Sequence, residues 1–458
     1  MGRIDHVASA RLLNERFILM LSLAVIIALY GGIGRDLFFN RLSGARGEDA
    51  IGAILVYLRA GSAALGIVLC VYFAGSLKPI ESISILFVPY LLLAVYSLSW
   101  SDDAKNTLRT ALLGLLFYAA ISAIANRITL EKMAAAMLRL LALTLIASVV
   151  VAVLIPSIGT HTNADIAQSV HAGRWRGIFV HKNGLGANAA YGAILFWYYG
   201  DLLSRSRLLV WVARISALLC LVFSGSATSI VVAAALAAYA TMLAFKKVHP
   251  LVWLICICGF AVLYYLFAQA GWSNLIFDLI GRDETLTGRT LIWDLAYVSM
   301  GQSPFLGYGF GSFGGVEFGA KVAATYTDNV LGPESSYYNI ILELGVIGLA
   351  LFIIPLLECF RRAFTYGKDY RFGDRRAIEC FALIVFGAMV AGISETPPWL
   401  FTSYGGPINF AALFSLASVR TQVSYASTSY RLRPGRVLTA QMAARWSRSL
   451  KSPADDGV

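Results

Sequence analysis

Cationic and imidazole side chains gather in one short segment of the chain. Residues 157–183 hold three of the five histidines, two arginines and a lysine: His161, His171, Arg174, Arg176, His181 and Lys182. A histidine can act as an acid or a base near neutral pH, whereas Arg and Lys bind phosphate groups. The segment therefore favours chemistry on an anionic substrate, and the alternative role for His181 is to cap the helix that follows it. No carboxylate stands at metal-ligand spacing beside these residues, so we expect no metal site.

A second segment, residues 271–337, combines an arginine, a run of glycines and a glutamate. Arg289 stands in the string LTGRTLIWDLA, and Glu334 precedes an apolar run. Between them, Gly307, Gly309 and Gly311 alternate with other residues in SPFLGYGFGSFGG. The glycines lack the preceding strand of a dinucleotide-binding unit. We interpret them as a tight turn whose backbone amides approach a neighbouring helix or an anionic group. Glu334 is either a helix cap or a general base.

Long apolar runs must position these residues. The chain is 58% hydrophobic and only 14% charged, and soluble proteins have about a quarter charged residues, so a soluble globular protein is excluded. About twelve of the runs are long enough to cross a hydrocarbon core of about 30 Å as helices. The fold class expected is therefore an all-α polytopic integral membrane protein, with about 12 transmembrane helices and a large outward loop.

Five regions follow from the positions of these runs. They are a cytoplasmic N-terminus (1–16), nine transmembrane helices with one outward loop at 157–183 (17–270), a large outward loop (271–337), three transmembrane helices (338–419) and a basic cytoplasmic tail (420–458). Within the large loop, Leu291, Ile292, Leu295 and Val298 have helical spacing. This spacing predicts an amphipathic helix that lies along the outer membrane face.

The basic residues indicate the orientation. Of the 37 Lys and Arg residues, 25 lie in the termini and the loops predicted to be cytoplasmic, and 11 lie in the opposite loops. This bias is the one that the positive-inside rule requires, and it places both termini in the cytoplasm. The basic tail is expected to face lipid headgroups and needs no nucleic-acid partner. Glu343 and the other charges within spans fall near span ends, where side chains can reach the interface, and this disfavours an ion-coupled transporter.

Several short motifs, in this order, resemble those of the O-antigen ligase and polysaccharide polymerase superfamily of bacterial inner membranes, including exopolysaccharide polymerases of the succinoglycan type. The resemblance covers most of residues 90–360. It is carried by Trp100-Ser101 before an acidic turn, Arg176-Gly177 with Phe179, His181, Lys182, Asn183 and Gly186, the small polar residues 224–229, Gly288-Arg289 with Trp293, the glycine run at 304–313, and Glu343-Leu344-Gly345 with Gly348.

This resemblance implies a membrane glycosyltransferase of the GT-C type that needs no metal and no cofactor. It would use oligosaccharides linked to undecaprenyl diphosphate at the periplasmic face of a Gram-negative inner membrane, so both outward loops would be periplasmic. Arg289 and Arg176 would bind the diphosphate and Glu334 would be the base, with Arg174, His181, Lys182 and Asn183 as substrate-binding residues. Membrane lipids, a chain-length regulator and export proteins are the partners that such an enzyme implies.

One departure from the family pattern separates two activities. In the ligases a histidine followed by Asn stands nine residues before the glutamate that is Glu343 here, whereas this chain has Glu334 followed by Ser335. A carboxylate can also serve as a base. We therefore favour a polymerase that joins repeat units. The alternatives are an O-antigen ligase, which transfers glycan to lipid A core, and a lipid-linked oligosaccharide flippase, which would hold its arginines in a central cavity.

Overall fold

The computed structural model describes residues 17–30, 48–74, 84–125, 127–163, 171–245, 285–312, 333–366, 372–395, 399 and 405–417. The long labelled helices are α3 (Glu48–Ala74), α4 (Ser84–Tyr96), α5 (Ala104–Ala125), α6 (Leu130–Leu154), α8 (Lys182–Tyr198), α10 (Arg207–Ser224), α11 (Ala227–Phe245), α14 (Thr285–Gln302), α16 (Ser336–Tyr366), α17 (Phe372–Ala391) and α18 (Gly406–Ala417). Short helices are η2 (Ser97–Ser99), α7 (Pro156–Gly159) and α9 (Gly200–Leu203). No strand is present in these ranges, where one β-bridge joins Thr160 to Trp175. The all-α fold class is confirmed.

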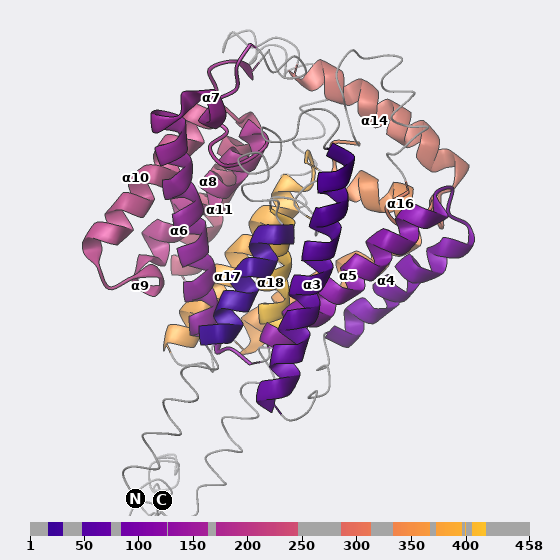
Figure 1. The fold of residues 1–458 in the computed structure, drawn as a ribbon, viewed down its shortest axis with the longest axis horizontal. Helices are drawn as coiled ribbons and strands as arrows, with labels where there is room; N and C mark the ends of the chain where they lie inside the picture. The colour runs from indigo at the N-terminus through magenta and orange to yellow at the C-terminus, as the bar shows by residue number, and fades with distance from the viewer. Residues whose placement is uncertain are drawn as a thin grey trace, which may run out of the picture. The chain divides into compact units, whose positions relative to one another are not determined.

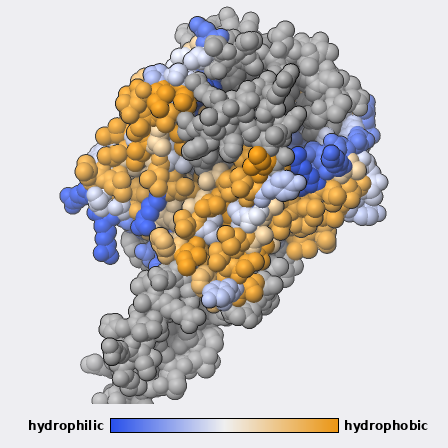
Figure 2. Space-filling view, viewed as in Figure 1, coloured by the Kyte–Doolittle hydropathy of each residue, from blue (hydrophilic) through white to orange (hydrophobic). Residues whose placement is uncertain are grey.

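Several of these helices have the length and composition of membrane spans. Five described helices are long and apolar enough to cross a membrane: Ile54–Phe73, Ala104–Ala125, Leu130–Leu154, Arg207–Ser224 and Ser336–Ala363. Apolar side chains also cover broad areas of the described surface (Figure 2), as expected of helices that face lipid. The chain is thus a polytopic membrane protein. The count of about 12 spans stays a prediction, and residues 1–16, 250–270 and 420–458 lie outside the described residues.

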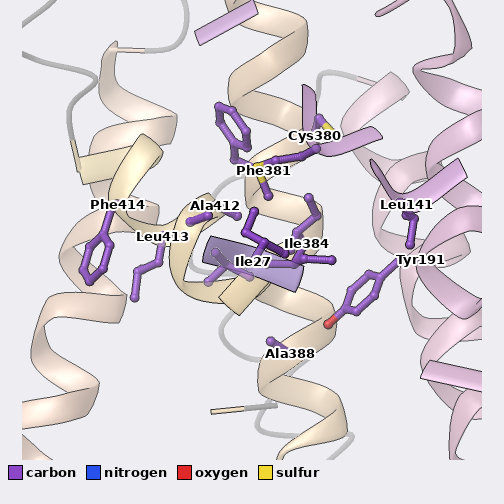
Figure 3. Close-up of a cluster of buried hydrophobic side chains, with 14 of the residues drawn as sticks. Ile27, Leu141, Tyr191, Cys380, Phe381, Ile384, Ala388, Ala412, Leu413 and Phe414 are labelled. Atoms are coloured by element: carbon purple, nitrogen blue, oxygen red, sulfur yellow. The ribbon is translucent and has the colours of Figure 1, made fainter. Parts of the chain in front are cut away.

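The centre of the packed helices is formed by α17 and α18. α17 packs against α6, α8, α11, α16 and α18. Phe381, Ile384 and Ala388 of α17 are buried, and they share a cluster with Ile27 and Leu413 (Figure 3). Small residues in this cluster allow helix backbones to approach closely, which is how helices associate where lipid removes the hydrophobic driving force.

The helices α7 and α14 of the two predicted outward loops lie at one end of the described helices, and Arg139 and Arg376, which are predicted to be cytoplasmic, lie near the other. Figure 1 shows α7 and α14 at one end and α9 at the opposite end. At the α9 end, an Arg376 Nη atom lies 2.5 Å from an Asp201 carboxylate oxygen. Arg139 Nε donates to the Leu203 carbonyl at 3.1 Å. The separation of these arginines from α7 and α14 agrees with the predicted topology. The compartment that each end faces stays a prediction.

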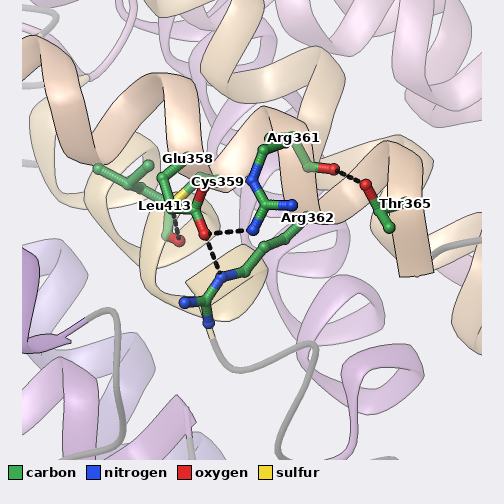
Figure 4. A network of polar contacts seen from close by, with 6 residues as sticks. All are labelled: Glu358, Cys359, Arg361, Arg362, Thr365 and Leu413. Atoms are coloured by element: carbon green, nitrogen blue, oxygen red, sulfur yellow. Dashed lines mark hydrogen bonds and ion pairs between the residues drawn. The ribbon is translucent and has the colours of Figure 1, made fainter.

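The last turns of α16 carry a small ion-pair network. Glu358 lies 2.5 Å from Arg361 Nε and 2.8 Å from Arg362 Nε (Figure 4). Its spacing of three and four residues from the arginines places all three side chains on one face of the helix. Arg362 is buried and Arg361 is exposed. The carboxylate therefore compensates a guanidinium that packs within the protein.

The helix predicted in the large loop is present as α14, and part of it packs against α16. Ile292 and Ala296 are buried and form a small cluster with Leu342 of α16, against which Leu295 packs. Val298 is 63% exposed, and its place on a face that meets the membrane stays a prediction. With 3.6 residues per turn, a residue six positions after Ile292 points away from it. The side chain of Leu291 lies outside the described residues.

The helix α16 is broken at Gly345. This glycine has φ 67° and ψ −173°, which interrupts the helix between Leu344 and Val346. The apolar run predicted as one span at 338–358 is therefore two helical pieces. Such a break leaves backbone carbonyls of the first piece and backbone amides of the second without helical partners.

The glycine run supplies those partners. The amides of Tyr308 and Gly309 donate to the carbonyls of Leu342 at 2.8 Å and Glu343 at 2.9 Å, respectively. In return, the Val346 amide donates to the Pro304 carbonyl at 2.9 Å. The prediction that the amides of this turn approach a neighbouring helix is confirmed.

Close backbone contact explains why glycines occupy these positions. A Cβ on Gly345 would lie 2.0 Å from the Phe305 carbonyl, and one on Gly309 would lie 2.5 Å from the Ser101 side chain. The Phe310 amide donates to Ser97 Oγ at 3.0 Å, and an Asn106 amide nitrogen donates to the Gly311 carbonyl. The run thus joins the turn between α4 and α5 to the break in α16.

The first prediction concerns the break. Gly345→Ala should destabilise the protein because backbone in this region of φ and ψ costs a residue with a side chain about 1–3 kcal/mol, and the added methyl group would meet the Phe305 backbone. Thermal unfolding of the purified protein in detergent measures the effect. Gly61→Ala is the matched control, since a Cβ on Gly61 meets nothing within 4 Å. Equal unfolding midpoints for the two variants would contradict the tight fit at the break.

Candidate functional site

The loop that follows α6 folds back on that helix, and Arg176 holds it there. The Arg176 amide donates to the Gly159 carbonyl at 2.8 Å, and its Nε donates to the Ile158 carbonyl at 2.9 Å. Gly177 has φ 59°, and a Cβ there would lie 2.3 Å from Ser148 of α6. Arg176 is buried, with 9% of its surface exposed. Its guanidinium is therefore fixed in orientation by the loop backbone.

The three histidines of this loop meet at the start of α8. Their ring centroids are 5.2 to 5.8 Å apart: His161, His171 and His181. His161 Nε2 accepts a hydrogen bond from the Lys182 amide at 3.1 Å, and His181 Nδ1 accepts one from the Asn183 amide at 3.2 Å. Two imidazoles thus cap the first turn of α8, which is the alternative role expected for His181. In the described ranges, no set of three His, Cys, Asp or Glu residues is placed to hold a metal ion.

The other predicted cations occupy separate places. Arg174 is exposed, and its side chain lies over the turn between α10 and α11, where a Cβ on Gly225 would come within 2.7 Å of an Arg174 Nη atom. Lys182 is the first residue of α8. Arg289 lies in α14, and its side chain is outside the described residues. His181, Lys182 and Asn183 are consecutive at the start of α8, and the Arg174 backbone is hydrogen-bonded to His161 and His171, whose rings lie against His181.

A turn after α17 joins the starts of α8 and α16. Asn183 Nδ2 donates to a Glu395 carboxylate oxygen at 3.3 Å. The Ser336 amide and Oγ donate to the Glu395 carbonyl at 3.0 and 2.8 Å. Ser335 Oγ donates to the Gly392 carbonyl at 3.2 Å. Asn183 and the segment that holds Glu334 are more than a hundred residues apart in the chain, and this turn connects them.

Glu395 is a buried carboxylate that sequence reasoning missed. Only 7% of its surface is exposed. The available signal was its position in the string SETPPW, directly after an apolar run and before two prolines. From the sequence alone, an acidic residue at this position is interpreted as an ordinary residue of a turn between helices. The sequence does not reveal that Asn183 contacts it.

Glu334 has an unusual backbone conformation. Among the described residues it is the one non-glycine residue with positive φ, at 49°. The following Ser335, rather than Glu334, caps α16, because its Oγ accepts from the Tyr338 amide at 3.5 Å and its carbonyl accepts from the Asn339 amide at 3.0 Å. A side-chain-bearing residue in this conformation costs about 1–3 kcal/mol, and such strain clusters at functional sites.

Glu343 is buried, contrary to the expectation that it reaches the membrane interface. Its exposed fraction is 6%, and a carboxylate oxygen accepts from Asn339 Nδ2 at 3.0 Å. The Gly311 backbone amide also hydrogen-bonds this carboxylate. The reason for the difference is the break at Gly345, which places Glu343 beneath the glycine run.

The second prediction tests the contact between Asn183 and Glu395. Asn183→Ala removes a donor from a buried carboxylate, which should lower the free energy of unfolding by about 1–3 kcal/mol. Glu395→Ala should have a similar effect, and the double variant should lose less than the sum because the two residues share one contact. Thermal or chemical unfolding in detergent gives the coupling. Additive losses would show that the two side chains do not interact.

Comparison with known proteins gives a family and one relative. Residues 212–353 match the family described as O-Antigen ligase. That segment contains Arg289, the glycine run, Glu334 and the broken part of α16, and it begins after Arg176 and His181. The chain is also similar to the exopolysaccharide production protein ExoQ of Rhizobium meliloti (strain 1021), with 27% identity over 229 residues. This match spans 47% of the chain and 51% of that relative, about half of its length. The resemblance to the O-antigen ligase and polysaccharide polymerase superfamily is thereby confirmed.

Proposed function

We propose that this protein is a polysaccharide polymerase of the bacterial inner membrane. It transfers a growing glycan from undecaprenyl diphosphate to the terminal sugar of another lipid-linked repeat unit at the periplasmic face. The observation that carries the proposal is that the family match covers the segment from Arg289 to the break in α16, which includes the strained Glu334. The proposed orientation has both termini in the cytoplasm.

The proposed reaction is a displacement at the anomeric carbon of the donor sugar. The acceptor hydroxyl oxygen forms a bond to that carbon, and the bond from the carbon to the diphosphate oxygen breaks. Glu334 takes the hydroxyl proton, and undecaprenyl diphosphate leaves with the bonding electrons. A leaving diphosphate gains negative charge, which oriented guanidinium groups stabilise. Arg289 and Arg176 have this role in the proposal, and Arg174, His181, Lys182 and Asn183 contact the substrate.

The structure offers support for an oriented cation at position 176. Its Nε is engaged by the Ile158 carbonyl, so the guanidinium plane is held before the substrate arrives. A group that is fixed in advance does not have to reorganise as charge develops, and this is where electrostatic catalysis obtains its advantage. The Arg174 guanidinium lies on the exposed side of the same loop.

The position of the arginines favours an enzyme over a flippase. A flippase is expected to hold its cations in a cavity between helices. Arg174 is exposed in a loop and the Arg176 side chain is bound to the Ile158 carbonyl. Neither arginine lines the cavity around Glu343 or the cavity around Asn409. The ligase alternative shares the fold and the donor, and we disfavour it because Glu334-Ser335 stands where the ligases have a histidine and an asparagine.

The third prediction separates the role of Glu334 in catalysis from its effect on stability. Glu334→Gly should raise the free energy of unfolding by up to about 1 kcal/mol, because glycine adopts positive φ without penalty. The same variant should abolish polymer, since no base is left. Thermal unfolding and gel analysis of cellular glycan measure the two effects. Glu334→Gln is the isosteric companion and should also lack activity; a normal polymer level from either variant rules out the base.

The fourth prediction tests the proposed function in cells. A deletion strain should accumulate single repeat units on the carrier at the periplasmic face, and a plasmid copy should restore polymer. Arg289→Ala should fail to restore it at normal protein levels, because the diphosphate then loses a cation. Mass spectrometry of the lipid-linked glycan gives the chain length. Long chains still on the carrier would indicate a ligase, and single units trapped on the cytoplasmic face would indicate a flippase.

A further inference from the structure

A cavity beside the break in α16 is lined mainly by aromatic rings. They come from α4, α5, α18 and the glycine run, and include Tyr90, Phe117, Tyr118 and Phe414. The Tyr118 and Phe414 ring centroids are 4.8 Å apart at an interplanar angle of 86°. The rings thus form packed walls, and the cavity offers about 50 Å³ of space, enough for on the order of four water-sized groups.

The remaining wall is a polar stripe on the first piece of α16. Ser336, Asn339 and Glu343 line the cavity at spacings of three and four residues, which places them on one face of the helix. Asn339 Nδ2 donates to the Glu343 carboxylate at 3.0 Å. A hydroxyl, an amide and a carboxylate therefore face the same apolar space.

Burial of a carboxylate in an apolar environment costs free energy, so a functional explanation for Glu343 is worth seeking. Glu343 is 6% exposed and lies within a helix of membrane-spanning length and composition. Ionisable residues within membrane spans mark substrate or ion pathways, and broken helices at membrane depth line cavities. An apolar pocket with a few converging polar groups is also the usual form of a small-molecule site. These features together indicate a ligand rather than a purely structural contact.

The polar and aromatic groups that line the cavity are suited to binding a sugar. A sugar ring presents hydroxyl groups at its edge and polarised C–H groups on its faces. Carboxylate and amide oxygens accept hydrogen bonds from hydroxyls, and the negative faces of aromatic rings attract positive edges.

We infer that this cavity is the subsite for the terminal sugar of the acceptor glycan. The assignment to the acceptor follows from α16 itself, since Ser336 lines the cavity and Glu334, the proposed base, stands two residues before it. The inference rests on the proposed polymerase function and names the part of the protein that recognises the sugar accepting the chain.

The test is a binding measurement with two ligands. The full-length protein in lipid nanodiscs is titrated with lipid-linked repeat units extracted from the deletion strain, and separately with undecaprenyl diphosphate alone. Glu343→Gln should weaken binding of the repeat unit about tenfold, because it replaces a charged acceptor by a neutral amide oxygen and hydrogen bonds to charged groups are the stronger ones. Binding of the bare carrier should not change, because it has no sugar.

Two further variants keep the test decisive. Glu358→Gln is the matched control on the same helix; Glu358 pairs with Arg361 and Arg362 at the far end, so this variant should bind both ligands as the wild type does. Gly114→Ala adds a methyl group to another wall of the cavity, on α5. Alanine is tolerated in helix interiors at least as well as glycine, so this variant should fold and should also weaken binding of the repeat unit.

Each outcome has a separate meaning. Wild-type affinity of Glu343→Gln and Gly114→Ala for the repeat unit would overturn the subsite while polymer formation in cells still supports the proposed function. Equal weakening for the repeat unit and the bare carrier would overturn it too, since a structural defect affects both ligands. Failure of the wild-type protein to bind the lipid-linked repeat unit at all would instead count against the proposed function.

Discussion

The backbone groups at the break in α16 must find hydrogen-bond partners inside an apolar bundle, and this requirement organises the surrounding structure. Unpaired amides and carbonyls are costly where water is absent. The glycine run meets the requirement from outside the helix, through Tyr308, Gly309 and Pro304. Because the donors must approach the Leu342 and Glu343 carbonyls closely, the run has glycines at the contact points. α14 leads directly into this run, and its residues Ile292 and Ala296 pack against Leu342 near the break.

The turn after α17 is a second point, besides the break in α16, at which distant segments are held together. The starts of α8 and α16 are both joined to the turn after α17, through Asn183 and Ser336. This arrangement gathers groups from three distant parts of the chain at one end of the helices. It also holds Glu334 in a backbone conformation that glycine would adopt more readily. Strain of this kind persists only where the neighbouring structure determines it. Ser335 is anchored through its hydroxyl group, and Ser336 through both its amide and its hydroxyl group.

The two proposals share one element. In the proposed polymerase, the first piece of α16 carries the base before its N-terminus and a polar stripe for the acceptor sugar along one face. A short rigid helical piece sets the separation between these two groups, and rigid spacing is what converts binding of a remote sugar into correct placement of the reacting hydroxyl. The break at Gly345 ends that piece and separates it from the rest of the span, whose far end is occupied by the Glu358 network.

The sequence by itself determined the class of fold, the presence of α14, the role of the glycine run beside a helix, and the segments that hold the candidate residues. Composition, helical spacing and glycine content report on such local properties directly. It did not reveal the break in α16, the burial of Glu343 or the contact of Asn183 with Glu395. Those features depend on which backbone and side-chain groups from distant segments meet. Helical periodicity is nearly the same for an intact and a broken apolar helix, so only tertiary packing decided where α16 breaks and which carboxylates are buried there.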